Sequence, residues 1–254
     1  MSDPEVHIYP HLEELSRAAA EFFVEITNLW IGQSGSFRVA LSGGATPRRL
    51  YELLGSSDYS DRIAWGNIHL FQVDERCVPP EHPESNFRMI REALLEPGRV
   101  PRGIVHRIPG EHPDPAEAAS EYALEIGRVI QPQAGTFPQF DLILLGLGAD
   151  GHTASLFPGS AVLEERTRWV CPSLPPQHGY GRITMTLPVL NAAAHVAFLV
   201  AGPEKAEILR TVLEGPREAR RLPAHEIKPA NGRVSWYIDR GAASCLGRVG
   251  GSEQ

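Results

Sequence analysis

Short apolar runs alternate along this chain with longer segments of helical periodicity, and this alternation limits the possible fold more than any other feature. From Leu12 to Trp30 apolar residues recur every three or four positions, with charged residues mostly between them. This spacing predicts an amphipathic helix. Residues 142–147 are apolar apart from one glycine, which predicts a buried strand. The alternation is typical of a largely parallel sheet with helices on both faces.

The same rhythm continues through the rest of the chain. Thr46 followed by Pro47 is expected to cap a helix and to fill its first position, and Ser85 and Asp114 are expected to open two further helices. The segment 181–193 is expected to change from a strand to a short helix at Pro188. Other strands are predicted at 38–44, 68–75, 105–108, 195–202 and 234–239, and other helices at 85–95, 117–130, 203–215 and 239–246.

Length and composition favour one globular domain. With 254 residues, of which 42% are hydrophobic, we expect a single α/β domain over 1–248 and a disordered tail over 249–254. The three cysteines lie far apart and the histidines lack metal-ligand spacing, so neither a disulfide framework nor a metal site is expected.

The net charge and the hydropathy of the chain limit the binding partners and the cellular location that we expect. A net charge of -7 without a long basic block disfavours nucleic acid as the main partner. The acidic N-terminal segment does not resemble a signal peptide, and no apolar run is long enough for a membrane span. We therefore expect a cytoplasmic protein, a monomer or a small homo-oligomer, that binds no membrane.

Three polar motifs follow predicted strands, at the sheet edge where ligands of parallel sheets bind. The first is LSGGATP, in which the backbone N–H groups of Gly43 and Gly44 can cradle a phosphate beside a helix N-terminus. Ser42 and Thr46 would add hydroxyl donors. Because the motif matches neither the Walker A nor the G-x-G-x-x-G pattern, a tight turn without a ligand is the alternative.

The second motif, Asp74-Glu75-Arg76, lies before a proline-rich loop. Arg76 can hold an anion and Asp74 can bind hydroxyl groups, whereas the alternative is a solvated turn with an Asp–Arg pair.

The third motif, LGLGADGHTASLFP, is the most informative, because a polar Asp-x-His directly after a buried strand is costly for packing alone. His152 can accept a proton from water near neutral pH, and Asp150 can orient its ring. The alternative is a structural histidine.

Two cations complete the candidate site. Arg182 follows the glycine-containing segment QHGYG, and Lys205 lies at the start of a predicted helix. Each is an ordinary surface residue in isolation. A cation in the first turn of a helix is unfavourable unless an anion binds nearby, so the position of Lys205 favours an anionic ligand.

Taken together, the motifs LSGGATP, VDERCVP with the downstream His82 and SN, LGLGADGHTASLFPG, RITMTLPVLNAA and VAGPEKAEIL resemble those of the 6-phosphogluconolactonase family. That family lies within the group that also contains glucosamine-6-phosphate deaminase (isomerase). The resemblance covers about residues 37 to 214. It implies a three-layer, modified Rossmann-like fold with a mainly parallel sheet flanked by helices.

The resemblance implies hydrolysis of 6-phospho-D-glucono-1,5-lactone to 6-phospho-D-gluconate in the oxidative pentose phosphate pathway, without metal or organic cofactor. By analogy, the glycine loop, Arg182 and Lys205 hold the phosphate, and His152 is the catalytic acid/base. The oxyanion formed in such a hydrolysis needs donors, for which Arg76 and nearby backbone N–H groups are both candidates.

Two rival functions remain open at the sequence level. In the deaminase the segment after Asp-Gly-His usually reads I-A-F-N-E-P, with a glutamate that helps ring opening, whereas this chain has Phe157 at that place. A phenyl ring cannot transfer a proton, which favours the lactonase over a deaminase-like aldose-ketose isomerase. The second rival is a non-catalytic sugar-phosphate-binding protein, against which the pair of Asp150 and His152 argues.

Overall fold

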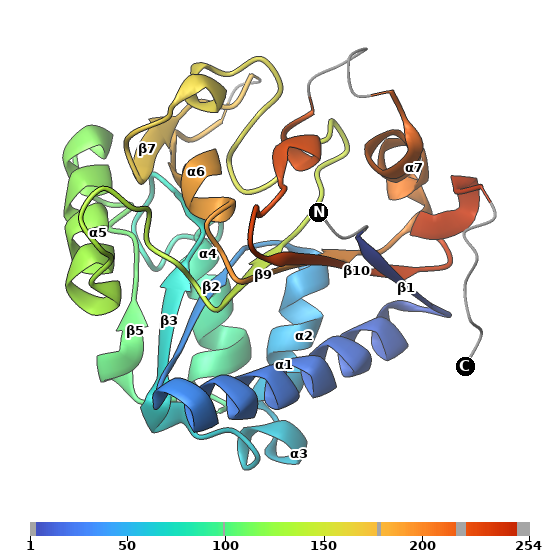
Figure 1. Cartoon of the computed structure of the whole chain (residues 1–254), viewed down its shortest axis with the longest axis horizontal. Coiled ribbons are helices and arrows are strands. Elements are labelled where there is room, and N and C mark those ends of the chain that lie inside the picture. Colours follow the sequence, from blue (N-terminus) through green and yellow to red (C-terminus); the bar gives the residue numbers. More distant parts are fainter. Residues whose placement is uncertain (1–3, 99, 177–178, 217–221, 248–254) are drawn as a thin grey trace.

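The computed structural model describes residues 4–98, 100–176, 179–216 and 222–247 and has a seven-stranded parallel sheet at its centre (Figure 1). Every neighbouring pair of strands in this sheet is parallel, so the predicted parallel sheet is confirmed. In spatial order the strands are β1 (Glu5–Tyr9), β10 (Arg233–Asp239), β9 (His195–Val200), β6 (Leu142–Leu145), β2 (Phe37–Leu41), β3 (Ile68–Gln72) and β5 (Val105–His106). The sequence analysis missed β1.

Helices cover both faces of the sheet, which confirms the three-layer arrangement (Figure 1). One layer contains α1 (Leu12–Ser34), α2 (Ala45–Gly55), α3 (Ser57–Ser60) and α4 (Asn86–Ile90), which continues as a π-helical turn over Arg91–Leu95. The other contains α5 (Pro115–Ile130), α6 (Leu187–Leu190) and α7 (Ala206–Glu214). Short 3₁₀ turns lie at Trp65–Asn67, Arg102–Ile104, Ala161–Glu164, Pro203–Lys205, Pro223–Glu226 and Ala242–Cys245.

The central strand β6 is buried on both faces, and this explains why its residues are all apolar instead of alternating with polar ones. Ile143 and Leu145 point into the core beneath α5, α6 and α7, whereas Leu142 and Leu144 point into the core beneath α1 and α2. All four side chains are at most 2% exposed. A strand covered on both faces tolerates polar side chains only beyond its ends, and this places the functional groups in the loops.

A second, three-stranded antiparallel sheet contains β4 (Asp74–Arg76), β8 (Arg182–Met185) and β7 (Val170–Ser173), in the order β4-β8-β7. The single strand predicted at 68–75 is therefore wrong. The chain leaves the large sheet at Val73, whose N–H donates to Leu41 and whose carbonyl accepts from the Met185 N–H, both at 2.9 Å. Val73 thus joins the two sheets, and the residues after it pair with β8. The sequence analysis also missed β7.

Local capping signals predicted two helix starts correctly and one incorrectly. The Ser85 side chain accepts a hydrogen bond from the Arg88 N–H, and the Asp114 side chain accepts one from the Ala116 N–H. Thr46 is not a cap, because α2 begins at Ala45 and Gly44 is the residue before it. Thr46 already has helical backbone geometry, which a capping residue does not have.

Two expectations about chain organisation stay predictions. The tail at 249–254 lies outside the described residues, and no observation tests the assignment of 1–248 to one domain. Among the helices that the structure describes, none combines the length and the hydropathy of a membrane-spanning segment.

The start of β9 carries a buried histidine whose protonation opposes folding. His195 is 9% exposed, lies 5.0 Å from the Phe22 ring and has its Nε2 atom 2.9 Å from the Ser235 hydroxyl. Burial is the main cause that lowers the pKa of His195 to about 4, against about 6.5 in an unfolded chain. Between these two values the unfolded state binds more protons than the folded state. The folded state therefore loses stability as the pH falls.

We predict that acidification from pH 7 to pH 4 lowers the free energy of unfolding by roughly 3 kcal/mol through His195 alone. Urea denaturation at several pH values measures this loss. In the His195→Gln variant the fall over the same range should be smaller by about that amount. Equal pH dependence in both proteins would contradict the assignment.

Candidate active site

The order of the strands reverses between β2 and β6. After β2 the chain builds β3 and β5 on one side, and after β6 it builds β9 and β10 on the other. A reversal of this kind opens a crevice beyond the carboxyl ends of the two strands. A pocket of about 380 Å³ lies there, lined by residues 42–47 after β2 and by residues 146–149 and 152–154 after β6.

The pocket collects most of the residues predicted from sequence. It is lined by Ser42, Gly43, Gly44, Thr46, Asp74, Arg76, His152 and Lys205. The other two predicted site residues, Asp150 and Arg182, are not among the described residues that line the pocket. Asp150 contacts His152, and Arg182 lies directly opposite Arg76 in the pairing of β4 with β8.

His152 is held by Asp150 through two hydrogen bonds. Nδ1 of the ring lies 2.5 Å from Asp150 Oδ1, and the His152 backbone N–H donates to the same oxygen at 3.1 Å. Burial raises the pKa of Asp150, but hydrogen bonds and charge from His152 outweigh it and keep that pKa below its ordinary value. An ionised Asp150 accepts a hydrogen bond from Nδ1–H, so in the neutral form of the ring Nε2 is the acceptor nitrogen.

The glycine-rich loop brings this ring against the backbone. A Cβ atom at Gly148 would lie 2.1 Å from His152 Nδ1, a distance that no side chain can occupy. The Gly148 N–H also donates to the His152 carbonyl at 2.8 Å. The side chain of His152 remains 34% exposed and its ring lies 5.0 Å from that of Phe157. The ring is therefore fixed in position and still reachable from solvent.

Asp74 joins β4 to the loop that carries the histidine. It is 6% exposed, and its carboxylate accepts a hydrogen bond from the Ser155 hydroxyl at 2.5 Å. The side-chain amide of Asn86 donates to the Asp74 carbonyl at 2.9 Å and lies 3.4 Å from Asp74 Oδ1. Within the described residues no ion pair joins Asp74 to Arg76, so the alternative of a solvated Asp–Arg turn is wrong.

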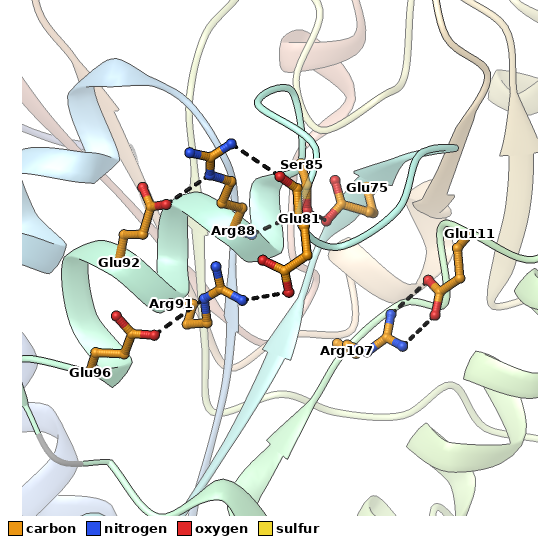
Figure 2. A network of polar contacts seen from close by, with 9 residues as sticks. All are labelled: Glu75, Glu81, Ser85, Arg88, Arg91, Glu92, Glu96, Arg107 and Glu111. Atoms are coloured by element: carbon orange, nitrogen blue, oxygen red, sulfur yellow. Dashed lines mark hydrogen bonds and ion pairs between the residues drawn. The ribbon is translucent and has the colours of Figure 1, made fainter.

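Glu75 shapes the wall of the pocket from behind and is not among the described residues that line it. Its carboxylate is 2% exposed and contacts Ser85 at the start of α4 (Figure 2). It accepts hydrogen bonds from the backbone N–H groups of Arg76, Asn86 and Phe87, from the Ser85 hydroxyl and from the Gln72 amide, at 2.7 to 3.0 Å. This one carboxylate therefore fixes both Arg76 and the first turn of α4.

The cations at the pocket differ from those on the nearby surface. Arg88, Arg91 and Arg107 each form ion pairs with glutamates (Figure 2). In the part of the chain that the structure describes, Arg76, Arg182 and Lys205 have no carboxylate within 4.0 Å. Burial, and next the Arg76 guanidinium, lower the pKa of Arg182. Uncompensated positive charge of this kind favours an anionic ligand.

The sequence analysis assigned no role to three residues that belong to the site. Asn86 and Glu204 line the pocket, and Ser155 holds Asp74. Asn86 and Ser155 lie inside the motifs noted above, directly after Ser85 and three residues after His152. Their motif positions were the available signal. Only the fold reveals that both meet Asp74.

Comparison with known proteins identifies the family. The family model of glucosamine-6-phosphate isomerases/6-phosphogluconolactonase matches residues 10–236. This chain belongs to that family. The 6-phosphogluconolactonase of a Synechocystis species is 40% identical to it over 85% of this chain and 87% of the relative, and that of a Nostoc species is 35% identical over 95% and 98%.

A solved structure supports the same assignment. The 6-phosphogluconolactonase of Trypanosoma brucei superposes with a TM-score of 0.84 at 28% identity, over 97% of this chain and all of that one. The resemblance stated from sequence motifs, and the Rossmann-like fold implied by it, are confirmed for this member of the 6-phosphogluconolactonase group.

We predict that Glu75→Gln lowers the free energy of unfolding by about 3 kcal/mol or more, because buried N–H donors then lose a charged acceptor. Chemical denaturation measures this change. Glu81→Gln is the matched control, since Glu81 is 69% exposed and pairs only at the surface with Arg91; its effect should stay below about 1 kcal/mol. Similar effects of the two substitutions would contradict the role of Glu75.

Proposed function

We propose that this enzyme hydrolyses 6-phospho-D-glucono-1,5-lactone to 6-phospho-D-gluconate, with His152 as the general base. The observation that carries the proposal is the Asp150–His152 pair beside a pocket whose cations have no acidic partner in the described chain. Several curated relatives of this chain are 6-phosphogluconolactonases, and their activity fits this arrangement.

The phosphate group is anchored first. The backbone N–H groups of Gly43 and Gly44 precede α2, whose N-terminus favours an anion. Lys205 adds a positive charge at the pocket wall, and Arg182 adds one from the strand beside Arg76. Anchoring at the distant phosphate holds the lactone ring so that its C1 carbonyl carbon lies near His152.

His152 then activates water. Nε2 of the neutral ring takes a proton from a water molecule as the water oxygen forms a bond to C1 of the lactone. The resulting tetrahedral oxyanion is stabilised by Arg76 or by nearby backbone N–H groups. When the bond between C1 and the ring oxygen breaks, the imidazolium returns the proton to that oxygen, and the open-chain acid is released. Asp150 stabilises the imidazolium between the two steps.

The deaminase activity known in the same family fits this site less well. Phe157 stands where that relative has a glutamate, and its ring packs 5.0 Å from the ring of His152. It offers no group for proton transfer. Release of ammonia from glucosamine 6-phosphate at a rate comparable to lactone hydrolysis would reverse this preference.

The remaining assignments rest on the sequence. We place the enzyme in the cytoplasm as a monomer or small homo-oligomer that uses no cofactor and binds neither nucleic acid nor membrane, in line with its net charge of -7.

We predict that His152→Ala lowers kcat by about 100-fold or more and changes KM little, because the base acts in the chemical step. The rate is measured with freshly prepared lactone, and spontaneous hydrolysis is subtracted. His7→Ala, in β1, whose side chain is 41% exposed, serves as the control and should match the wild type. Turnover of the His152 variant within about threefold of the wild type would exclude the proposed base.

We predict that Lys205→Ala raises KM for the lactone by about 10- to 100-fold, with a smaller effect on kcat, because a charge-assisted contact to phosphate is lost. Arg210→Ala, which removes a surface cation on α7 paired with Glu207, should leave KM within about twofold of the wild type. An unchanged KM in the Lys205 variant would rule out its contact with the phosphate.

A further inference from the structure

A carboxylate outside the pocket holds the turn that leads to Lys205. Asp239 is the last residue of β10, and it lies beside the end of β9 because Val200 pairs with Ile238 in the parallel register. The Gly202 backbone N–H donates to Asp239 and lies 3.1 Å from each of its two carboxylate oxygens. Asp239 is not among the described residues that line the pocket, so a contact between Asp239 and a ligand there is not expected.

Gly202 connects this carboxylate to the cation. Its φ of +101° favours glycine, and a Cβ atom there would lie 2.4 Å from the Glu204 carboxylate. The next residue, Pro203, has no N–H group with which to hold the turn. The Lys205 N–H donates to the Gly202 carbonyl at 3.1 Å. Gly202 is therefore bonded to Asp239 through its N–H and to Lys205 through its carbonyl.

The Asp239 carboxylate is itself fixed by the turn that follows β10. Its Oδ1 atom also accepts a hydrogen bond from the Ala242 N–H at 2.7 Å, and Ala242 is fully buried. A Cβ atom at Gly241 would lie 3.2 Å from the Pro203 ring, so this turn packs directly on the one before α7. Among the described residues no lysine, arginine or histidine lies within 4.0 Å of the Asp239 carboxylate. Its hydrogen bonds thus go to backbone N–H groups of the two turns.

We infer that Asp239 is a positioning residue for phosphate binding, because it fixes the Gly202 turn and thereby the backbone from which Lys205 reaches into the pocket. Without this anchor the turn has to be ordered when the ligand binds, and that ordering lowers the affinity. No bond that forms or breaks in the reaction involves Asp239, so its effect falls on KM and not on kcat. The inference rests on the proposed function, since it assigns a support for the phosphate-binding side of the same pocket.

The first test measures the kinetics of two variants with the lactone. Asp239→Ala should raise KM about 10-fold and leave kcat within about twofold of the wild type. In Asp239→Asn the amide oxygen can still accept from Ala242 and Gly202, so KM should rise only about threefold. The asparagine variant replaces the alanine variant if the latter does not fold. An unchanged KM in the folded variants, or a fall in kcat as large as the rise in KM, would overturn the inference.

Glu214→Ala is the matched control. Glu214 ends α7, and its carboxylate likewise accepts a hydrogen bond from a backbone N–H, that of Gly247 at 2.9 Å. It is not among the described residues that line the pocket, and KM should stay within about twofold of the wild type. A rise in KM as large as that of Asp239→Ala would mean that any loosening of α7 has this effect, and the inference would be wrong.

A double variant tests whether Asp239 acts through Lys205. If it does, Asp239→Ala should add nothing once the cation is gone, so the KM of the double variant should lie within about twofold of that of Lys205→Ala alone. Independent effects would instead multiply. Multiplied effects, or a KM that Lys205→Ala alone leaves unchanged, would contradict the positioning role.

A binding measurement separates this inference from the proposed function. Calorimetric titration with 6-phosphogluconate should show binding to Asp239→Ala that is about 10-fold weaker than to the wild type, and no such difference in the Lys205→Ala background. If the wild-type protein fails to hydrolyse the lactone but shows this pattern of binding, the proposed function is wrong and the role of Asp239 stands. Equal affinities of the wild type and Asp239→Ala, or no binding to the wild type, would refute that role whatever the activity.

Discussion

The reversal of strand order between β2 and β6 is the constraint on which the site depends. Both strands are buried on both faces, so polar groups can follow them only beyond their carboxyl ends. At these ends the chain places the glycine turn that precedes α2 and the loop that carries His152. Because β3 lies beside β2, the chain after Val73 reaches the same crevice and adds Asp74 and Arg76.

The pocket is lined by two kinds of polar group, cations and hydrogen-bond acceptors. Lys205 and Arg76 supply positive charge without a carboxylate partner in the described chain, whereas the Asp74 carboxylate supplies acceptors. A substrate with a phosphate at one end and hydroxyl groups along a ring is oriented by this division. In the proposed mechanism the imidazole of His152, held by Asp150, then lies next to the carbonyl carbon rather than next to a hydroxyl group. Orientation of this kind contributes to catalysis because it removes the entropy cost from the reactive step.

The sequence predicts the groups that face the ligand better than the groups that hold them. Asp150 and His152 follow an apolar run directly, and the cost of placing them there for packing alone made their role visible. Ser85 and Asp114 were recognised as caps because capping depends on neighbouring residues. Asn86 and Ser155, in contrast, gain their role only by meeting Asp74 across long sequence separations. No local pattern carries that information.

The errors in the predicted elements have the same origin. Most of the residues at 68–73 are apolar and continue without a turn signal into 74–75. The chain nevertheless changes sheets at Val73, whose backbone is hydrogen-bonded to Leu41 of one sheet and to Met185 of the other. The strands β1 and β7 are short and partly polar, and their partners are distant in sequence. Arg182, which sequence reasoning placed with the phosphate ligands, lies beside Arg76 on the neighbouring strand; the pairing of β4 with β8 sets this position.

A crystal structure with 6-phosphogluconate bound tests the central claim most directly. The account predicts the phosphate at the Gly43–Gly44 turn and Lys205, the hydroxyl groups along Asp74, and the C1 carboxylate next to His152 Nε2. A complex in which the carboxylate lies at the glycine turn and the phosphate beside His152 would contradict the account.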